Sequence, residues 1–474
     1  MAGTFPSLDA VGNSRTKSIQ DGIASVAGML ASLWREYGST FTIELSVFIS
    51  QLSVYKLASR FLGKEGFSEY AVARRVIAVI CPLALLGLIV ALPRFIAHSR
   101  EDSGTSGRVG YLGAALCCVS VTTGIIFVLA ILLPGRVAAL FFGNSEFAYL
   151  VFPLSVTVVG LTFHTTMYAF FRGNLAMRWA NTIQFINLGL VPPLVFIVQR
   201  KDVRAILVEL GTVMFLVAGV AMFAIAPWRE VLFVRWWRVK ELLRYGIQRL
   251  PGDLALLGLF TLPVTITAHA SGVQQAGLVA FGMVFLTVVS AMINPLGLIL
   301  LPKASRMFDA GKSIELQDHL MRLVKVVIVL VGGISIVLGL LTNPLIRVYL
   351  GPEFSPAVSM VRLILLSTVP YCLFLLLSHV IDAFHRNSVT AGIEITAFLV
   401  ASLGCWTAWF HARNVRGFLL AFLAGVLTLA ILASIACIKI FTAQISPPRD
   451  SGAGLSSDSP AAWPAGPESF SVEI

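Results

Sequence analysis

Charged residues are scarce in this chain, and their scarcity decides its broad class. Only 12% of the 474 residues are charged, whereas 57% are hydrophobic and the mean hydropathy is +0.86. A soluble protein uses charged side chains for about a quarter of its residues, so this sequence cannot cover a soluble surface. The length allows about a dozen membrane spans of roughly 20 residues each. We therefore predict an all-α polytopic membrane protein.

Cysteine is also scarce, and its placement excludes two kinds of site. All six cysteines fall in apolar stretches: Cys81, Cys117, Cys118, Cys372, Cys405 and Cys437. None has a C-x-x-C neighbour or a histidine at ligand spacing, which argues against a zinc site and a disulfide framework. We expect no metal and no cofactor.

Several enzyme motifs are missing. Residues 311–313 read Gly-Lys-Ser, but Arg306 stands where a phosphate-binding loop needs its first glycine, which argues against ATP-driven transport within the chain. Residues 63–67 lack the paired acids of a lipid-linked glycosyltransferase, and His379 with Asp382 is a poor, deeply placed pair for a membrane acyltransferase. Loops between apolar windows are short. We expect a protein that is not an enzyme, with a membrane glycan polymerase or acyltransferase as the alternative from another class.

Apolar windows predict twelve helices in two halves. They lie near 40–60, 72–97, 110–133, 147–171, 180–199 and 204–227, then 253–270, 276–302, 323–346, 358–383, 389–411 and 416–441. The predicted organisation is a cytoplasmic N-terminal segment (1–38), an N-terminal six-helix bundle (39–227), a basic interfacial connection (228–250), a C-terminal six-helix bundle (251–442) and a disordered cytoplasmic tail (443–474). Residues 1–38 lack a cleavable signal pattern, so the first apolar run serves as its own insertion signal.

The basic residues predict the orientation. The net charge is +11, and most of the 35 lysines and arginines fall on the side that holds both termini. The positive-inside rule then places both termini in the cytoplasm. The central connection contributes Arg229, Arg235, Arg238, Lys240, Arg244 and Arg249, interleaved with Trp228, Trp236 and Trp237. It reads as a helix lying in the cytoplasmic membrane interface, in contact with anionic lipid headgroups.

An internal repeat relates the two halves at an offset of 209 residues. Gly63 and Pro93 match Gly272 and Pro302, and the same offset carries Glu44 onto Asp253. Further landmarks recur at similar offsets: Tyr37-Gly38 with Tyr245-Gly246, Gly143 with Gly351, and Phe171-Arg172 with Phe384 and Arg386. Because six helices separate the copies, the halves share one orientation and are related by an axis along the membrane normal.

Polar residues share helix faces inside the apolar windows. The sets are Glu44, Gln51 and Tyr55; His164, Tyr168 and Arg172; Asn181, Gln184 and Asn187; Ser378, Asp382 and Arg386; and Glu394 alone. A charge near the bilayer centre costs on the order of 3 kcal/mol or more, so we expect these groups to face a shared central cavity.

Other interpretations stay open for some of these residues. Arg172, Arg386 and Lys56 could reach outward to the headgroups instead. Arg74, Arg75 and Glu209 are assigned to the membrane interface, because they lie near the ends of predicted helices. Asp382 and Arg386 could form an ion pair within one helix.

The ordered motifs resemble a known family. They are Ala58-Ser59-Arg60-Phe61-Leu62-Gly63-Lys64-Glu65-Gly66-Phe67, Leu92-Pro93-Arg94, Phe171-Arg172-Gly173 and Tyr245-Gly246. Over roughly residues 35–442 the chain resembles the oligosaccharide flippases, or polysaccharide transporters, of the multidrug/oligosaccharidyl-lipid/polysaccharide exporter superfamily. Ser68-Glu69-Tyr70 departs from the family pattern, which has a second glycine there. Residues 97–104 do not fit the loop of the major-facilitator family, the chief twelve-helix alternative.

The resemblance implies two six-helix bundles around a V-shaped cavity that opens alternately to each side of a bacterial inner membrane. The implied substrate is an oligosaccharide on polyprenyl (undecaprenyl) pyrophosphate, with proton or sodium coupling, and the implied partners are the polymerase and glycosyltransferases of the same pathway, without nucleic acid. Candidate residues for the diphosphate are Lys56, Arg172, Arg249 and Arg386, His164 and Asp382 complete the cavity, and Glu44 and Asp253 are candidates for coupling or gating. A cation-coupled exporter of small toxic molecules is the alternative within the same superfamily.

Overall fold

The computed structural model describes residues 40, 42–102, 104–225, 231, 234–291, 293, 313–384, 389–411 and 413–445. The predicted segment 1–38, most of the tail, Pro302 and Arg386 lie outside these ranges. The backbone of Arg249 is described but its side chain is not.

All regular secondary structure in the described ranges is helical, which confirms the predicted fold class. Eleven helices there are long and apolar enough to cross a membrane. They are preceded by helical residues 42–61, a more polar helix that carries Glu44, Gln51 and Lys56. The first half contains α2 (Gly63–Leu85), α3 (Leu88–Asp102), α4 (Gly104–Leu132), α5 (Pro134–Phe142), η1 (Ser145–Leu150), α6 (Val151–Gly173), α7 (Met177–Gln184), the π-helical turn η2 (Phe185–Leu190), α8 (Val191–Gln199) and α9 (Val203–Ile225). The second half contains α11 (Trp236–Ser271), α12 (Val273–Ala291), α14 (Ser313–Tyr349), η3 (Pro352–Phe354), α15 (Ala357–Leu365), α16 (Thr368–Phe384), α17 (Val389–His411) and α18 (Val415–Ile445).

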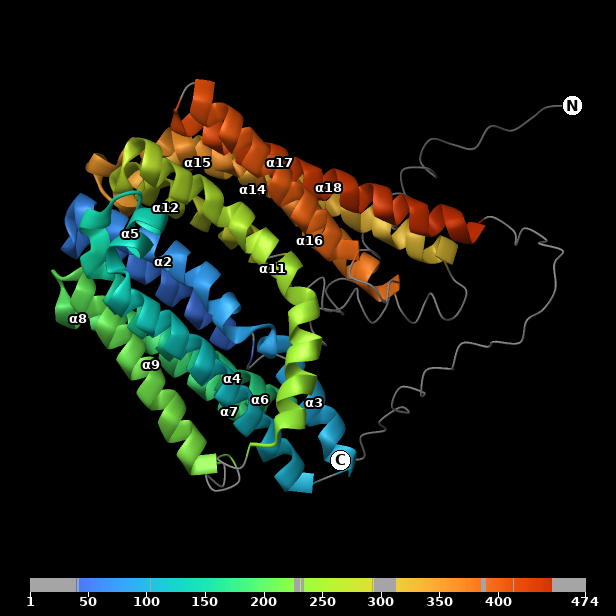
Figure 1. The fold of residues 1–474 in the computed structure, drawn as a ribbon. Helices are drawn as coiled ribbons and strands as arrows, with labels where there is room; N and C mark the ends of the chain where they lie inside the picture. The colour runs from blue at the N-terminus through green and yellow to red at the C-terminus, as the bar shows by residue number, and fades with distance from the viewer. Residues whose placement is uncertain are drawn as a thin grey trace, which may run out of the picture.

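The two halves meet at one end of the molecule and separate toward the other. In Figure 1 the helices from α2 to α9 form one group and those from α12 to α18 form a second group. The groups lie close together where α5, α12 and α15 are found, and α11 runs between them toward the opposite end. We call the end where the two groups lie close together the contact end. The opposite end, where α3, α9, α16 and α18 finish, is called the separated end.

Aromatic side chains from both halves pack together at the contact end. Phe67 lies 4.8 Å from Phe354 and 5.9 Å from Phe281 between ring centroids, and Tyr55 lies 5.6 Å from Phe281. All four rings are buried. Edge-to-face pairs of this kind contribute about 0.5–1.5 kcal/mol each beyond the burial of their area. The cluster therefore holds the halves together at this end.

The second predicted span is longer than expected and is broken. It begins at Gly63 instead of 72, and it is interrupted at Leu86 and Gly87, which have φ angles of 48° and 75°. A Cβ atom on Gly87 would lie 2.4 Å from the carbonyl oxygen of Gly246 in α11, and one on Gly246 would lie 2.2 Å from the carbonyl oxygen of Leu86. Only glycine permits the backbones to come this close.

Helix α11 joins the halves without a break in its secondary structure. It packs on α2, α3 and α4 of the first half and on α12, α17 and α18 of the second half. Gly246, before Pro251, lies against the break between α2 and α3, and Gly252, after it, lies against α17. The predicted boundary at residues 250 and 251 falls inside this helix. Proline at position 251 has no backbone N–H and removes one helical hydrogen bond there.

The backbone repeats at the predicted landmarks. Gly63 and Gly272 both separate two helices with a positive φ, 65° and 83° respectively. Gly143 and Gly351 also have positive φ angles, and a 3-10 helix follows each of them. The equivalence inferred from scattered residues thus corresponds to matching turns in the two halves.

Candidate functional site

Three helices of the first half bring polar side chains together at the separated end. Gln184 on α7 donates from Nε2 to Oε1 of Glu44 at 3.4 Å. Arg172, near the end of α6, lies within electrostatic range of Glu44, and its guanidinium is 5.6 Å from the ring centre of Tyr168. One member of each of these three predicted polar faces, Glu44, Arg172 and Gln184, therefore meets the others in one cluster.

His164 lies one turn deeper than Tyr168 on α6 and is 2% exposed. Nδ2 of Asn187 donates to its Nδ1 at 3.0 Å, and its ring stacks on that of Tyr168 with 6.3 Å between centroids. Asn187 lies in the π-helical turn η2, a distortion that often re-aims side chains at functional sites. The geometry makes His164 a support for the Tyr168 ring from inside the bundle.

Lys56 lies at the other end of helix 42–61, about 18 Å from Glu44 along the helix axis. Its Nζ donates to the carbonyl oxygen of Val348 at 3.1 Å and lies 6.0 Å from the ring centre of Tyr349. The hydroxyl of Tyr349 donates in turn to the carbonyl oxygen of Leu52. Lys56 thus contacts the C-terminal carbonyls of α14, where a cation is favoured by the helix dipole.

Arg74 and Arg75, which the sequence analysis did not include among the site residues, lie in the middle of α2. Arg74 comes eleven residues after Gly63, about 16 Å along the helix. Its Nη2 donates to Oε1 of Gln51 at 2.8 Å, and its guanidinium lies 5.0 Å from the ring centre of Tyr55. The helix starts nine residues earlier than predicted, so Arg74 and Arg75 lie well inside it and not near its end, which removes the reason for the interfacial assignment.

Arg75 points to the boundary between the halves. It lies within electrostatic range of Tyr371 on α16, and Tyr371 is also within range of Glu394 on α17. The ion pair formed in the described part of the chain, Arg204 with Asp202, lies elsewhere, so no described carboxylate is within ion-pairing distance of Arg74 or Arg75. Among the described residues, the groups next to Arg74 are an amide and tyrosine rings, and Arg75 has the Tyr371 hydroxyl in its electrostatic range.

The acids of the second half lie on three neighbouring helices. Oδ1 of Asp382 accepts a hydrogen bond from Thr390 Oγ1 at 2.6 Å, which joins α16 to α17 at the separated end. Glu394 is 8% exposed and lies against α11, where a Cβ on Gly252 would be 2.6 Å from its Oε2. The exposed Asp253 follows in the chain. The predicted roles of the Arg249 and Arg386 side chains fall outside the described residues.

Three motifs that carried the family resemblance meet at the separated end. A Cβ on Gly173 would lie 2.8 Å from Cα of Pro93, so α6 packs closely on α3. Arg94 donates from Nη1 to the hydroxyl of Tyr245 at 2.9 Å and lies 4.6 Å from its ring centre. With Gly246 against Gly87, these contacts fasten the first part of α11 to the first half of the chain.

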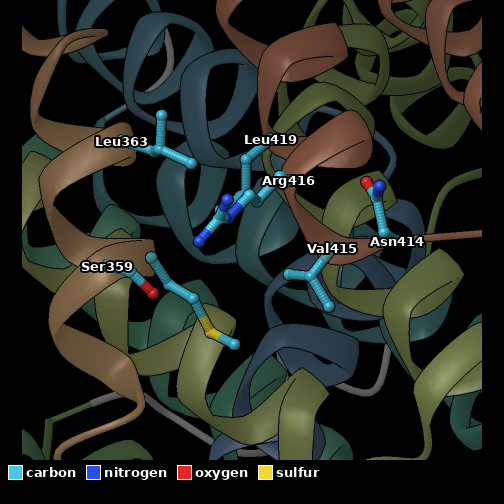
Figure 2. A pocket seen from close by; sticks show the side chains of 7 residues that line it. Ser359, Leu363, Asn414, Val415, Arg416 and Leu419 are labelled. Atoms are coloured by element: carbon cyan, nitrogen blue, oxygen red, sulfur yellow. The ribbon is translucent and has the colours of Figure 1, made fainter.

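A pocket of about 360 Å³ between α15 and α18 lies far from these groups (Figure 2). Figure 2 shows the Arg416 side chain extending toward the wall formed by Ser359 and Leu363. Arg416 is the single charged residue among those that line it. It shares no residue with the clusters above, and we do not place the site there.

Solved structures with a similar fold are transporters. A multidrug resistance MATE family transporter of the MOP superfamily in its inward-facing conformation superposes with a TM-score of 0.73 at 13% identity, covering 84% of this chain and 95% of that one. An outward-facing structure from the same family gives 0.56 at 14% identity, with 86% and 96% covered. A MOP superfamily transporter from Pyrococcus furiosus, described as having a binding pocket of reverse polarity, gives 0.58 at 12% identity, with 85% and 94% covered.

The fold is thus that of a MOP superfamily transporter, which confirms the predicted architecture. The family model described as "Polysaccharide biosynthesis protein" matches residues 33–308, more than half of the chain. The chain belongs to this family. A comparison with curated protein sequences gave no match.

Proposed function

We propose that this protein moves a polyprenyl-diphosphate-linked oligosaccharide across the bacterial inner membrane by alternating access. The observation that carries the proposal is the pair of arginines inside α2. Arg74 is held by the Gln51 amide and the Tyr55 ring, Arg75 lies within electrostatic range of Tyr371, and neither forms an ion pair with a described carboxylate. A charge at this depth costs on the order of 3 kcal/mol or more. An anionic headgroup that enters between the halves would neutralise it.

The residues around the arginines suit a sugar diphosphate. Arginine offers a planar fork of donors that matches phosphate oxygens. Arg74 donates one hydrogen bond to Gln51, which leaves other donors of its guanidinium for a phosphate. The polyprenyl tail stays in lipid at the separated end. The family membership agrees with a substrate from polysaccharide biosynthesis.

Glu44 and Asp253 take the coupling or gating role in this proposal. Glu44 lies within electrostatic range of Arg172. Asp253 directly follows Gly252, the α11 residue that packs against Glu394. Either acid could exchange its proton or cation when the halves move. With the termini in the cytoplasm, as the basic residues predict, the separated end faces the cytoplasm, where lipid-linked sugars are assembled.

The decisive experiment measures translocation of a lipid-linked oligosaccharide in proteoliposomes that contain Arg74→Gln or Arg75→Gln. We expect at least a tenfold loss for each, since each removes a charge-assisted contact with the diphosphate. Arg416→Gln, in the pocket of Figure 2, is the matched control and should keep full activity.

Normal translocation in both Arg74 and Arg75 variants would refute the proposal. Export of small organic cations by the unmodified protein would favour the multidrug alternative. In cells that lack the protein, accumulation of translocated but unpolymerised units would favour a membrane glycan enzyme instead.

A further inference from the structure

A second pocket, of about 600 Å³, lies where the first part of α11 crosses α3 and α4 at the separated end. Three arginines line it: Arg94 from α3, and Arg235 and Arg238 from the start of α11. Glu241 is the one acidic residue in the lining, and its Oε2 accepts a hydrogen bond from Tyr111 at 2.6 Å. The lining therefore carries a net positive charge.

Arg238 is placed as a buried anion ligand. It is 9% exposed, and its Nε has no hydrogen-bond partner in the described structure. Its guanidinium lies 5.3 Å from the ring centre of Tyr111 and 5.1 Å from that of Trp237. A Cβ on Gly110 would overlap its Nη1, so the glycine is what admits the side chain. The two rings hold the guanidinium in place and leave its Nε–H donor unused.

The pocket lies at the depth of lipid headgroups. The apolar span that includes α3 ends at Ser99, five residues after Arg94, and the span of α4 begins at Gly107. Trp236 and Trp237 at the start of α11 are 66% and 47% exposed. Exposed tryptophan beside the ends of membrane spans is typical of the membrane–water interface. The N-terminus of α11 adds its positive dipole end to the same place.

We propose that this pocket binds the phosphate of an anionic phospholipid, with phosphatidylglycerol as the representative, and that the bound lipid holds the first part of α11 against α3 and α4. Arg94 and Arg238 approach from different helices, so one phosphate can bridge them. The flanking tryptophans accommodate the glycerol and the upper acyl chains at the lipid surface. This site is separate from the central arginines and does not depend on what the protein transports.

The test is a titration of the purified full-length protein with phosphatidylglycerol and with phosphatidylethanolamine of the same acyl chains, read by native mass spectrometry. We expect phosphatidylglycerol to bind tighter, because the ammonium group of phosphatidylethanolamine offsets its phosphate charge. Arg238→Gln should weaken phosphatidylglycerol binding about tenfold and phosphatidylethanolamine binding by less. Arg94→Gln, at an exposed position, should give a comparable loss and keeps the test decisive if the buried Arg238 variant does not fold.

The matched control is Arg244→Gln, an exposed arginine on the same helix that does not line the pocket. It should bind phosphatidylglycerol as the unmodified protein does. An equal effect of Arg94→Gln and Arg244→Gln would overturn the proposal, because binding would then follow total charge alone. Displacement of the lipid by millimolar inorganic phosphate would overturn it too, because the pocket would then be a site for soluble phosphate.

Discussion

Gln274 donates a hydrogen bond from Nε2 to Oε1 of Glu65 at 3.3 Å, and the two residues are 209 positions apart, the offset of the internal repeat. Ser68 and Gly277, separated by the same offset, also touch: a Cβ on Gly277 would lie 2.4 Å from Cα of Ser68. Equivalent residues meet in this way only around a two-fold axis. The pseudo-symmetry axis therefore passes between the beginnings of α2 and α12.

Cross-linking at this axis should arrest the transporter. Cysteines at positions 65 and 274 (Glu65→Cys with Gln274→Cys, in a Cys117→Ser background that removes the exposed native cysteine) lie within reach of a short bifunctional thiol reagent. We expect the linked protein to lose translocation and a reversible linker to restore it on cleavage. Full activity of the linked protein would show that the contact end does not need to open; each single cysteine variant controls for modification alone.

The approach of α2 to α12 should be sensitive to one methyl group. Gly277→Ala places a Cβ against the backbone of Ser68, and we expect a loss of about 1–3 kcal/mol of stability, the usual cost of overpacking. Gly333→Ala on α14 has open space around it and should be neutral or stabilising by up to about 1 kcal/mol. Thermal unfolding of both variants in detergent compares them, and equal melting temperatures would contradict the close contact.

Glu44 and Arg172 should act as a coupled pair. If the two charges meet in the transport cycle, Arg172→Gln and Glu44→Gln will each reduce translocation, and the double variant will be no worse than the more impaired single variant. Additive losses would separate their roles. Unchanged transport in both Glu44→Gln and Asp253→Asn would remove these acids from the mechanism.

The bond between Asn187 and His164 should contribute to the stability of the first half. Asn187→Leu leaves Nδ1 of a buried histidine without its donor, at a cost of about 1–3 kcal/mol. Because replacing both partners by apolar groups is often nearly neutral, Asn187→Leu combined with His164→Phe should recover most of the loss. The melting temperatures of the three variants decide this; a double variant less stable than Asn187→Leu alone would count against the pairing.

Much of the fold could be predicted from the sequence, because spans of this length are dictated by the bilayer. Hydropathy located the apolar helices, and the repeat predicted the matching turns at Gly63 and Gly272. Of the polar faces that the spacing indicated, Glu44, Gln184 and Arg172 come together, whereas Gln51 and Tyr55 contact Arg74 instead.

The error on α2 has a physical origin. Residues 63–69 are glycine and charged or polar residues for the most part, so they resemble a loop, yet they begin a helix because Phe67 and Ser68 are buried against the second half. Arg74 and Arg75 were consequently placed at the membrane interface. The repeat held a usable signal: if Gly63 is the counterpart of Gly272, a helix should begin directly after it.

Contacts between segments that are distant in the chain could not be predicted from the sequence. Nothing in the local pattern shows that Arg94 binds Tyr245 or that Gly87 touches Gly246, since these pairs depend on how α11 crosses α3. The same holds for the break at Leu86, a residue that favours a continuous helix and adopts a left-handed conformation there.

The continuity of α11 gives the molecule an internal mechanical connection. This helix packs on both halves, so rocking of one half against the other would bend it, and each proline inside it, Pro251 and Pro263, lacks the hydrogen bond that would resist bending there. The stiffness of α11 would then limit how far the separated end can open. The bending stiffness of one helix would then determine the amplitude of the movement between the two halves.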